Sequence, residues 1–139
     1  MARQSARGSG ERCKFYQGLI DTLSAAAEST YELEKLQDDG LSLRIHLESY
    51  WRQTGVRPPQ LEIEPIPTEV QHVWGWWLQL QETRSSAFSG HSHITYTELD
   101  SWARLLDIKV TPFEVQCLMK LDSVFIICHA PEPVKPTEG

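Results

Sequence analysis

One helix-start signal occurs three times in the second half of this sequence, and it limits the possible folds more than any other feature. In each case a Thr precedes a Gln or a Glu by three residues, at Thr68 and Gln71, Thr95 and Glu98, and Thr111 and Glu114. In such a capping box the Thr side chain and the later Gln or Glu side chain bond each other's backbone N–H groups. Pro112 supports the third start, because the first helical position needs no N–H. The signals predict three helices, over residues 68–83, 95–107 and 111–128.

The first half of the chain has a longer helical pattern followed by an ambiguous one. Apolar residues recur at helical spacing from Glu11 to Gln37, and Asp38-Asp39-Gly40 then interrupts the pattern. Residues 41–53 alternate like a strand but also fit helical spacing. Gly55 just past the end is typical of a helix stop, and Arg52 in the last turn favours a helix as well. We therefore expect a second helix there.

These patterns predict an all-α protein with two helical regions. We expect a small helical domain in which an N-terminal helical pair (residues 11–57) is joined by a Pro-rich linker (58–67) to a Trp-rich three-helix unit (68–128). Residues 1–10 are small, polar and basic, and residues 129–139 are rich in Pro. Both end segments are predicted to be disordered.

Charge argues against nucleic acid as a partner. The net charge is −6, and because residues 1–14 carry +3, the remainder carries −9. An acidic body repels phosphates. The helices at 95–107 and 111–128 are spaced like a helix-turn-helix, but Lys120 is the only basic residue of the second, against Glu114 and Asp122. Packing of the two helices against each other is the better interpretation.

The sequence contains no recognisable membrane, catalytic or metal-binding motif. Its longest apolar run, Val124 to Cys128, is far shorter than the roughly 20 residues of a membrane-spanning helix, and no signal peptide is apparent, so a cytoplasmic protein is expected. His91 and His93 form a pair without further ligands at a suitable spacing. Cys128 and His129 are adjacent, and neighbours on a helix point about 100° apart. We predict no enzyme activity, no cofactor and no metal site.

The three cysteines have no pairing pattern. Cys13, Cys117 and Cys128 are odd in number, far apart and set among apolar residues. Such spacing is typical of buried thiols in a reducing compartment rather than of disulfides or of a metal site.

A cluster of tryptophans is the most informative feature for function. Trp74, Trp76 and Trp77 lie within four positions. On a helix, Trp74 and Trp77 share a face with Val73 and Leu80, and Trp76 falls about 40° beyond that face. Trp74 and Trp77 are therefore predicted to be core residues. Trp76 is either a residue at the rim of the core or part of an exposed apolar patch that binds a partner.

Several stretches of the sequence resemble the phage tail assembly chaperones of long-tailed phages and prophages. The resemblance covers residues 43–122. The matching stretches are Leu43 to Glu48, Arg52 to Gly55 with Pro58-Pro59, His72 to Leu78, Ile94 to Arg104, Pro112 to Val115, and Leu121-Asp122. Two departures are mild: Phe113 stands where the family usually has Trp, and Ser101 where it has a small apolar residue.

The resemblance implies a function in tail assembly without catalysis. Such chaperones bind the tape measure protein, a long and partly apolar helical chain, keep it soluble until the tail tube polymerises around it, and leave before the virion is complete. Further candidate partners are the major tail tube protein and a second copy of the chain. The expected partner-binding residues are Trp74, Trp76, Trp77, Tyr96, Trp102 and Phe113. Two alternatives stay open: a minor structural tail or connector protein of the virion, and a small helix-turn-helix-like regulatory adaptor.

Overall fold

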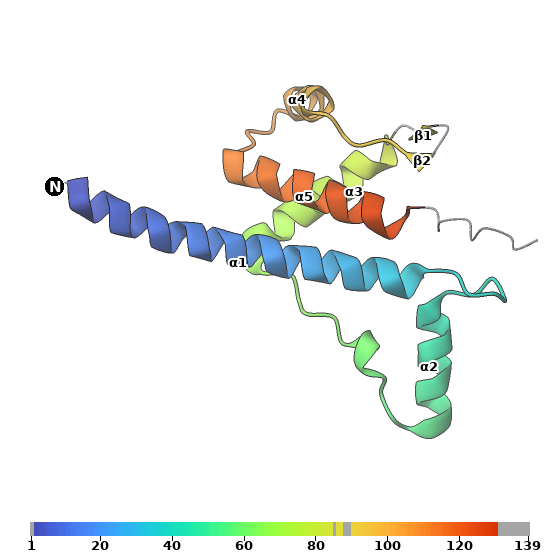
Figure 1. Ribbon diagram of the computed structural model, residues 1–139. Helices are drawn as coiled ribbons and strands as arrows, with labels where there is room; N and C mark the ends of the chain where they lie inside the picture. Colours follow the sequence, from blue (N-terminus) through green and yellow to red (C-terminus); the bar gives the residue numbers. More distant parts are fainter. Residues whose placement is uncertain (1, 85, 88–89, 131–139) are drawn as a thin grey trace, which may run out of the picture.

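The computed structural model describes the backbone of residues 2–84, 86–87 and 90–130, and the side chains from Gly10 onward apart from residues 85–91. Five helices account for most of it: α1 (Ala2–Glu34), α2 (Leu43–Thr54), α3 (Gln71–Glu82), α4 (Tyr96–Leu105) and α5 (Pro112–Cys128). Short 3-10 turns occupy Pro59–Leu61 and Thr68–Val70. The two-residue strands β1 (Ser86–Ala87) and β2 (Gly90–His91) form an antiparallel pair. The predicted all-α fold is confirmed (Figure 1).

Helix α5 lies at the centre of the packing: α1 runs along it and α3 crosses it (Figure 1). Its residues Cys117, Leu118, Leu121 and Val124 are buried. A helix that is apolar over most of its circumference needs cover on more than one side. Helix α3 supplies one cover through Val73, Trp77 and Leu80, and α1 supplies the other through a stripe of buried residues, namely Leu19, Ile20, Leu23, Ala27 and Tyr31. The side chains of α1, α3 and α5 thus share one core.

This core joins the two predicted helical regions, residues 11–57 and 68–128. The most extensive contact between helices joins α1 of the first region to α5 of the second. Burial of the apolar surface of α5 accounts for this pairing.

Helix α1 begins at Ala2 and so includes residues 2–10, where the sequence predicts a disordered tail. This segment contains residues with high helix propensity, among them Ala2, Arg3, Gln4, Ala6 and Arg7. At the other end of the chain, residues 131–139 lie outside the described part. His129, predicted to begin the disordered C-terminal tail, stacks on Phe125 with ring centroids 4.1 Å apart.

Helix α2 forms an arm that leaves the end of α1 and points away from α3, α4 and α5 (Figure 1). The Ser42 side chain caps its start by accepting from the Ile45 N–H. Gly55 ends it in the left-handed region, with φ 74°, and donates to the Trp51 carbonyl. The predicted helix and its stop are confirmed. None of its residues is buried, and Tyr50 and Trp51 remain exposed.

The capping boxes have three different outcomes. At Thr111 the box is complete, with hydrogen bonds in both directions between Thr111 and Glu114. At Thr95 only the Thr side chain bonds, to the Glu98 N–H. The box predicted at Thr68 is wrong: Thr68 opens a 3-10 turn held by the Val70 N–H on the Pro67 carbonyl, and α3 starts later without a side-chain cap.

The three thiols differ in exposure, so the prediction of uniformly buried cysteines is wrong for Cys13. Cys13 is exposed and lies one turn before Tyr16, which contacts Phe113 at the start of α5, whereas Cys117 is buried and Cys128 is half-buried. Burial raises the pKa of the Cys117 thiol to about 11 and also raises the pKa of Cys128. The thiolate is the reactive form, so both groups are expected to be slow nucleophiles.

A thiol titration tests this order. With a disulfide reagent at neutral pH, Cys13 should react rapidly, Cys128 slowly, and Cys117 only when the protein unfolds. The Cys13→Ser variant should lose the rapid phase alone. A rapid phase that persists in this variant would contradict the packing of α5 against α1.

Candidate partner-binding surface

Trp77 is the central core residue of α3. It is fully buried, and its indole N–H donates to the Tyr31 hydroxyl at 2.7 Å. Burial raises the pKa of Tyr31, which keeps this hydroxyl neutral. Trp77 was predicted as a core residue and was also included among the expected partner-binding residues. Its burial leaves no surface for a partner to contact in this structure.

Trp76 and Trp102 form an aromatic pair between α3 and α4. Their ring centroids lie 5.7 Å apart with the planes inclined at 70°, an edge-to-face arrangement. Both side chains are half-buried against the core. Two of the residues expected to bind a partner, 26 positions apart in the sequence, therefore meet at the surface.

Further aromatic contacts extend this pair across the molecule. The His72 ring lies edge-on to Trp76, with centroids 4.8 Å apart, and His72 also pairs with Glu114 at the start of α5. Next to Glu114, the Phe113 ring contacts the Tyr16 ring of α1, with centroids 4.6 Å apart. We call the set Tyr16, His72, Trp76, Trp102 and Phe113 the aromatic band. Its residues come from four of the five helices, α1, α3, α4 and α5.

Glu114 joins this band to the cap of α5. Burial raises its pKa, but hydrogen bonds from the Thr111 backbone and from His72 outweigh that effect, so the pKa of Glu114 is lowered from its ordinary value of 4.5. A carboxyl group with a lowered pKa in the folded protein stabilises it above the unfolded pKa, and this contribution is lost as the pH falls through the folded pKa.

The Glu114→Gln variant should therefore be less stable than the parent at about pH 7, by about 1 kcal/mol for the lost charge and weakened capping box. The difference should shrink at an acidic pH below that lowered pKa, where the parent carboxyl also becomes protonated. Urea unfolding curves at both pH values measure it. Glu69→Gln serves as the control, because Glu69 is an exposed carboxylate in the 3-10 turn before α3. An equal difference at both pH values would contradict the role of the charge.

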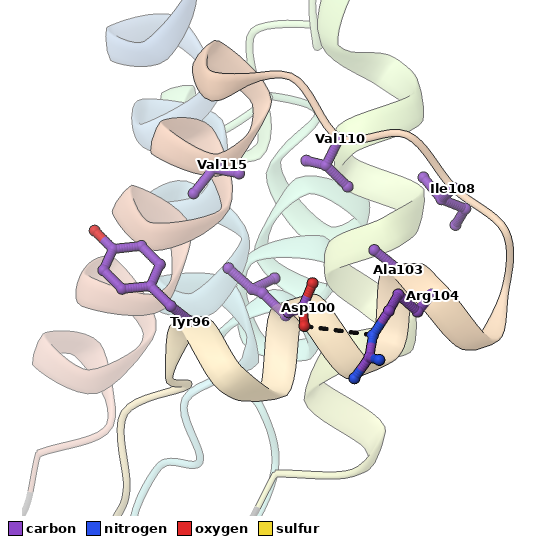
Figure 2. Close-up of a pocket in the computed structure, with 8 residues that line it drawn as sticks. Tyr96, Asp100, Ala103, Arg104, Ile108, Val110 and Val115 are labelled. Atoms are coloured by element: carbon purple, nitrogen blue, oxygen red, sulfur yellow. Dashed lines mark ion pairs between the residues drawn. The ribbon is translucent and has the colours of Figure 1, made fainter.

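The remaining predicted residues lie outside the band. Trp74 was predicted to be a core residue, but its side chain is only half-buried against the core, as that of Trp76 is. Tyr96 is 68% exposed and lines a groove of about 280 Å³ between α4 and α5, which Figure 2 shows. Trp102 lines a different groove, on the opposite side of α4. Tyr96 and Trp102 therefore do not share one surface.

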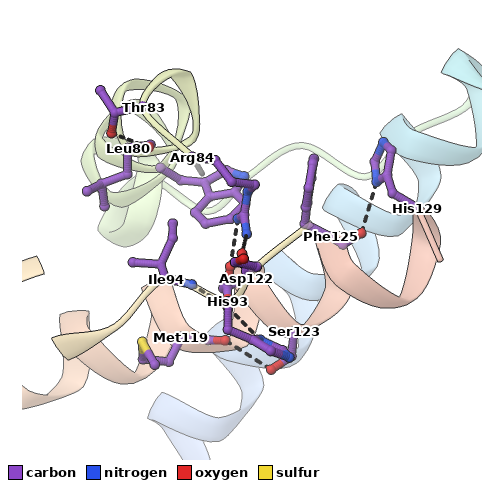
Figure 3. Close-up of polar contacts among 12 residues, drawn as sticks. Leu80, Thr83, Arg84, His93, Ile94, Met119, Asp122, Ser123, Phe125 and His129 are labelled. Atoms are coloured by element: carbon purple, nitrogen blue, oxygen red, sulfur yellow. Dashed lines mark hydrogen bonds and ion pairs between the residues drawn. The ribbon is translucent and has the colours of Figure 1, made fainter. Parts of the chain in front are cut away.

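A buried ion pair that the sequence patterns did not predict joins the segment after α3 to α5 (Figure 3). Nη2 of Arg84 lies 2.6 Å from Oδ1 of Asp122, and the two side chains are only 4% and 2% exposed. The Arg84 guanidinium also donates to the Ser92 carbonyl and covers the Phe125 ring, 4.3 Å from its centroid. The second oxygen of Asp122 accepts from the His93 ring and from the Ile94 N–H.

Asp122 thus connects α5 to both ends of the segment between α3 and α4. Arg84 begins that segment, and His93 and Ile94 end it. Because only Leu99 of α4 is buried, these connections contribute much of what positions α4. One signal was present in the sequence: Asp122 falls on the same helical face as Leu118, Leu121 and Phe125, where a carboxylate needs a partner.

The described residues show no arrangement suited to metal chemistry. Among them no three His, Cys, Asp or Glu side chains gather as ligands do, and the side chain of His91 lies outside them. His93 bonds Asp122, and Nδ1 of the His129 ring donates to the Phe125 carbonyl. No helix in the described part of the chain is both long and apolar enough to cross a bilayer.

Comparison with known proteins adds one finding. A family model described as phage tail assembly chaperone matches residues 50–126, more than half of the chain. The match begins within α2 and ends within α5, so it includes Trp76, Trp102 and Asp122 and leaves out α1. No curated protein and no solved structure matches.

Proposed function

Because the chain belongs to the phage tail assembly chaperone family, we propose that it binds the tape measure protein and keeps it soluble while the tail tube polymerises. On this proposal it acts in the host cytoplasm, has no enzyme activity and leaves before the virion is complete. The tape measure protein is a long, partly apolar helical chain, so its chaperone must present apolar surface to helices.

The observation that carries the proposal is the aromatic pair of Trp76 and Trp102. Aromatic residues that are half-buried in a pocket and half-accessible are typical centres of binding energy in protein interfaces. The pair lies on two helices within the residues that the family model matches. The net negative charge of the remainder of the chain would keep a complex with an apolar partner in solution.

The packing of α5 disfavours the regulatory alternative. A helix-turn-helix protein would insert the second helix of its pair into the major groove. Helix α5 would be that helix here, but α1 and α3 cover it, and five of its residues are buried. A structural tail or connector protein remains the second candidate, since the same aromatic surface would suit a permanent interface.

Coexpression with the tape measure protein of the same phage tests the proposal. We expect more soluble tape measure protein with this chain than without it, copurification of the two, and no trace of the chain in purified particles by mass spectrometry. Soluble tape measure protein in its absence would overturn the proposal. Recovery of the chain in particles, at a fixed number of copies, would favour the structural alternative.

A further inference from the structure

Helix α4 and the residue that follows it leave large apolar side chains exposed. Of its residues only Leu99 is buried, whereas Leu105 is 84% exposed and the following Leu106 is 52% exposed. A groove runs along each side of the helix. A short helix packed this sparsely offers its sides to a partner.

The groove on the α3 side has the lining expected of a helix-binding site. It has a volume of about 410 Å³, and its apolar walls are formed by Leu80, Ile94, Trp102 and Leu105. We call it the α3–α4 groove. Trp102 connects it directly to the aromatic band, because the same indole contacts Trp76. An amphipathic helix binds such a groove with apolar side chains three and four positions apart.

One charged group on this groove lacks a partner within the described residues. Glu98 lines the groove, is exposed, and its carboxylate forms no ion pair there. An occupant that supplies a cation would pair with this carboxylate.

The groove on the opposite side of α4 does not have this unbalanced charge. Its carboxylate, Asp100, already pairs with Arg104 at 3.4 Å, as Figure 2 shows. The two sides of one helix therefore differ: one is charge-neutral and the other carries an unpaired negative charge beside an apolar groove. Electrostatic complementarity favours a basic occupant on the α3 side.

We propose that the α3–α4 groove binds an amphipathic, basic helix of the tape measure protein. The apolar side chains of that helix insert between Leu80, Trp102 and Leu105, and a Lys or Arg one turn away pairs with Glu98. The proposal rests on the proposed function and assigns its site. The other groove and the α2 arm are the competing sites.

Binding of fluorescent, overlapping peptides of the tape measure protein to the full chain tests the site by anisotropy. Leu105→Asp should weaken the binding of the best peptide by about tenfold or more. Leu36→Asp, an equally drastic change at a 72% exposed leucine in the turn between α1 and α2, should leave it unchanged. Both side chains are exposed enough that thermal melting should show a folded protein in each case.

A charge swap on α4 makes the second arm of the experiment. Glu98→Lys should weaken binding by about fivefold and reduce its dependence on salt, and a peptide with its Lys or Arg changed to Glu should bind this variant better than it binds the parent. Asp100→Lys, the same charge change two residues on, should have little effect. Equal effects of Glu98→Lys and Asp100→Lys would overturn the site.

The outcomes separate this inference from the proposed function. If the parent chain binds the tape measure peptides and the Leu105 and Glu98 variants bind them equally well, the groove assignment is wrong and the chaperone function stands. If neither the peptides nor the intact tape measure protein bind the parent chain, both proposals fail together.

Discussion

Replacing Asp122 with Ala should lower the free energy of unfolding by about 3–5 kcal/mol, because it leaves the Arg84 guanidinium charged in the interior without its counter-ion. The side chains of this pair are almost fully buried. The His93 ring and the Ile94 N–H lose their acceptor in the same variant. Urea unfolding followed by far-ultraviolet circular dichroism gives the measurement.

Asp100→Ala is the matched control for this substitution. It removes the same side chain from another Asp–Arg pair, but Asp100 and Arg104 are 68% and 75% exposed. Solvent screens such a pair, so the loss should be below about 1 kcal/mol. Similar losses for the two variants would contradict the assignment of the Arg84–Asp122 pair to the interior.

A double replacement separates the charge effect from packing. In the Arg84→Met, Asp122→Leu variant no charge is left unpaired, so a large part of the stability lost in Asp122→Ala should return. The stability of the fold and the placement of α4 should then respond differently. The variant lacks the bonds that hold Ser92, His93 and Ile94, so α4 should be less firmly placed and tape measure binding should remain weak although the fold is restored.

The features that were predictable from the sequence depend on nearby residues. Thr111 and Glu114 are three positions apart, and Gly55 ends α2 through a bond to Trp51, so local pattern was sufficient for both. Thr68 shows the limit of that reasoning. Its spacing to Gln71 fits a cap, but the backbone after Pro67 forms a 3-10 turn and the Gln71 side chain bonds the Ile66 carbonyl.

The candidate site could be predicted only in part, because its contacts join residues far apart in the sequence. Trp76 and Trp102 were each identified as aromatic residues of interest, but their pairing depends on where α4 lies. That position depends in turn on Arg84 meeting Asp122, 38 positions away. Helical spacing predicts which face a side chain occupies and does not predict which other helix covers that face.

Trp77→Ala and Trp76→Ala should have opposite profiles, although the two residues are neighbours on α3. Trp77 is fully buried and bonded to Tyr31, so its truncation should cost about 3–5 kcal/mol of folding stability. Trp76 is half-buried, and its truncation should cost much less. Thermal and urea unfolding of each variant measure this difference.

Tape measure binding, measured on protein that remains folded, should depend on Trp76 rather than on Trp77. As a residue of the aromatic band beside the α3–α4 groove, Trp76 should contribute about 2 kcal/mol or more to tape measure binding, a loss of roughly thirtyfold on truncation. Trp51→Ala controls for loss of an exposed indole, because Trp51 lies on the α2 arm, 41% exposed and outside the band. It should change neither stability nor binding.

The comparison of Trp76 with Trp51 then decides between two roles for the aromatic band. If Trp76→Ala binds the tape measure protein as well as Trp51→Ala does, the contacts of Trp76 with His72 and Trp102 serve only to pack α3 against α4. If Trp51→Ala is the variant that loses binding, the tape measure protein binds the α2 arm instead. Loss of binding in Trp76→Ala alone, with the melting curve preserved, requires that part of this indole faces the partner.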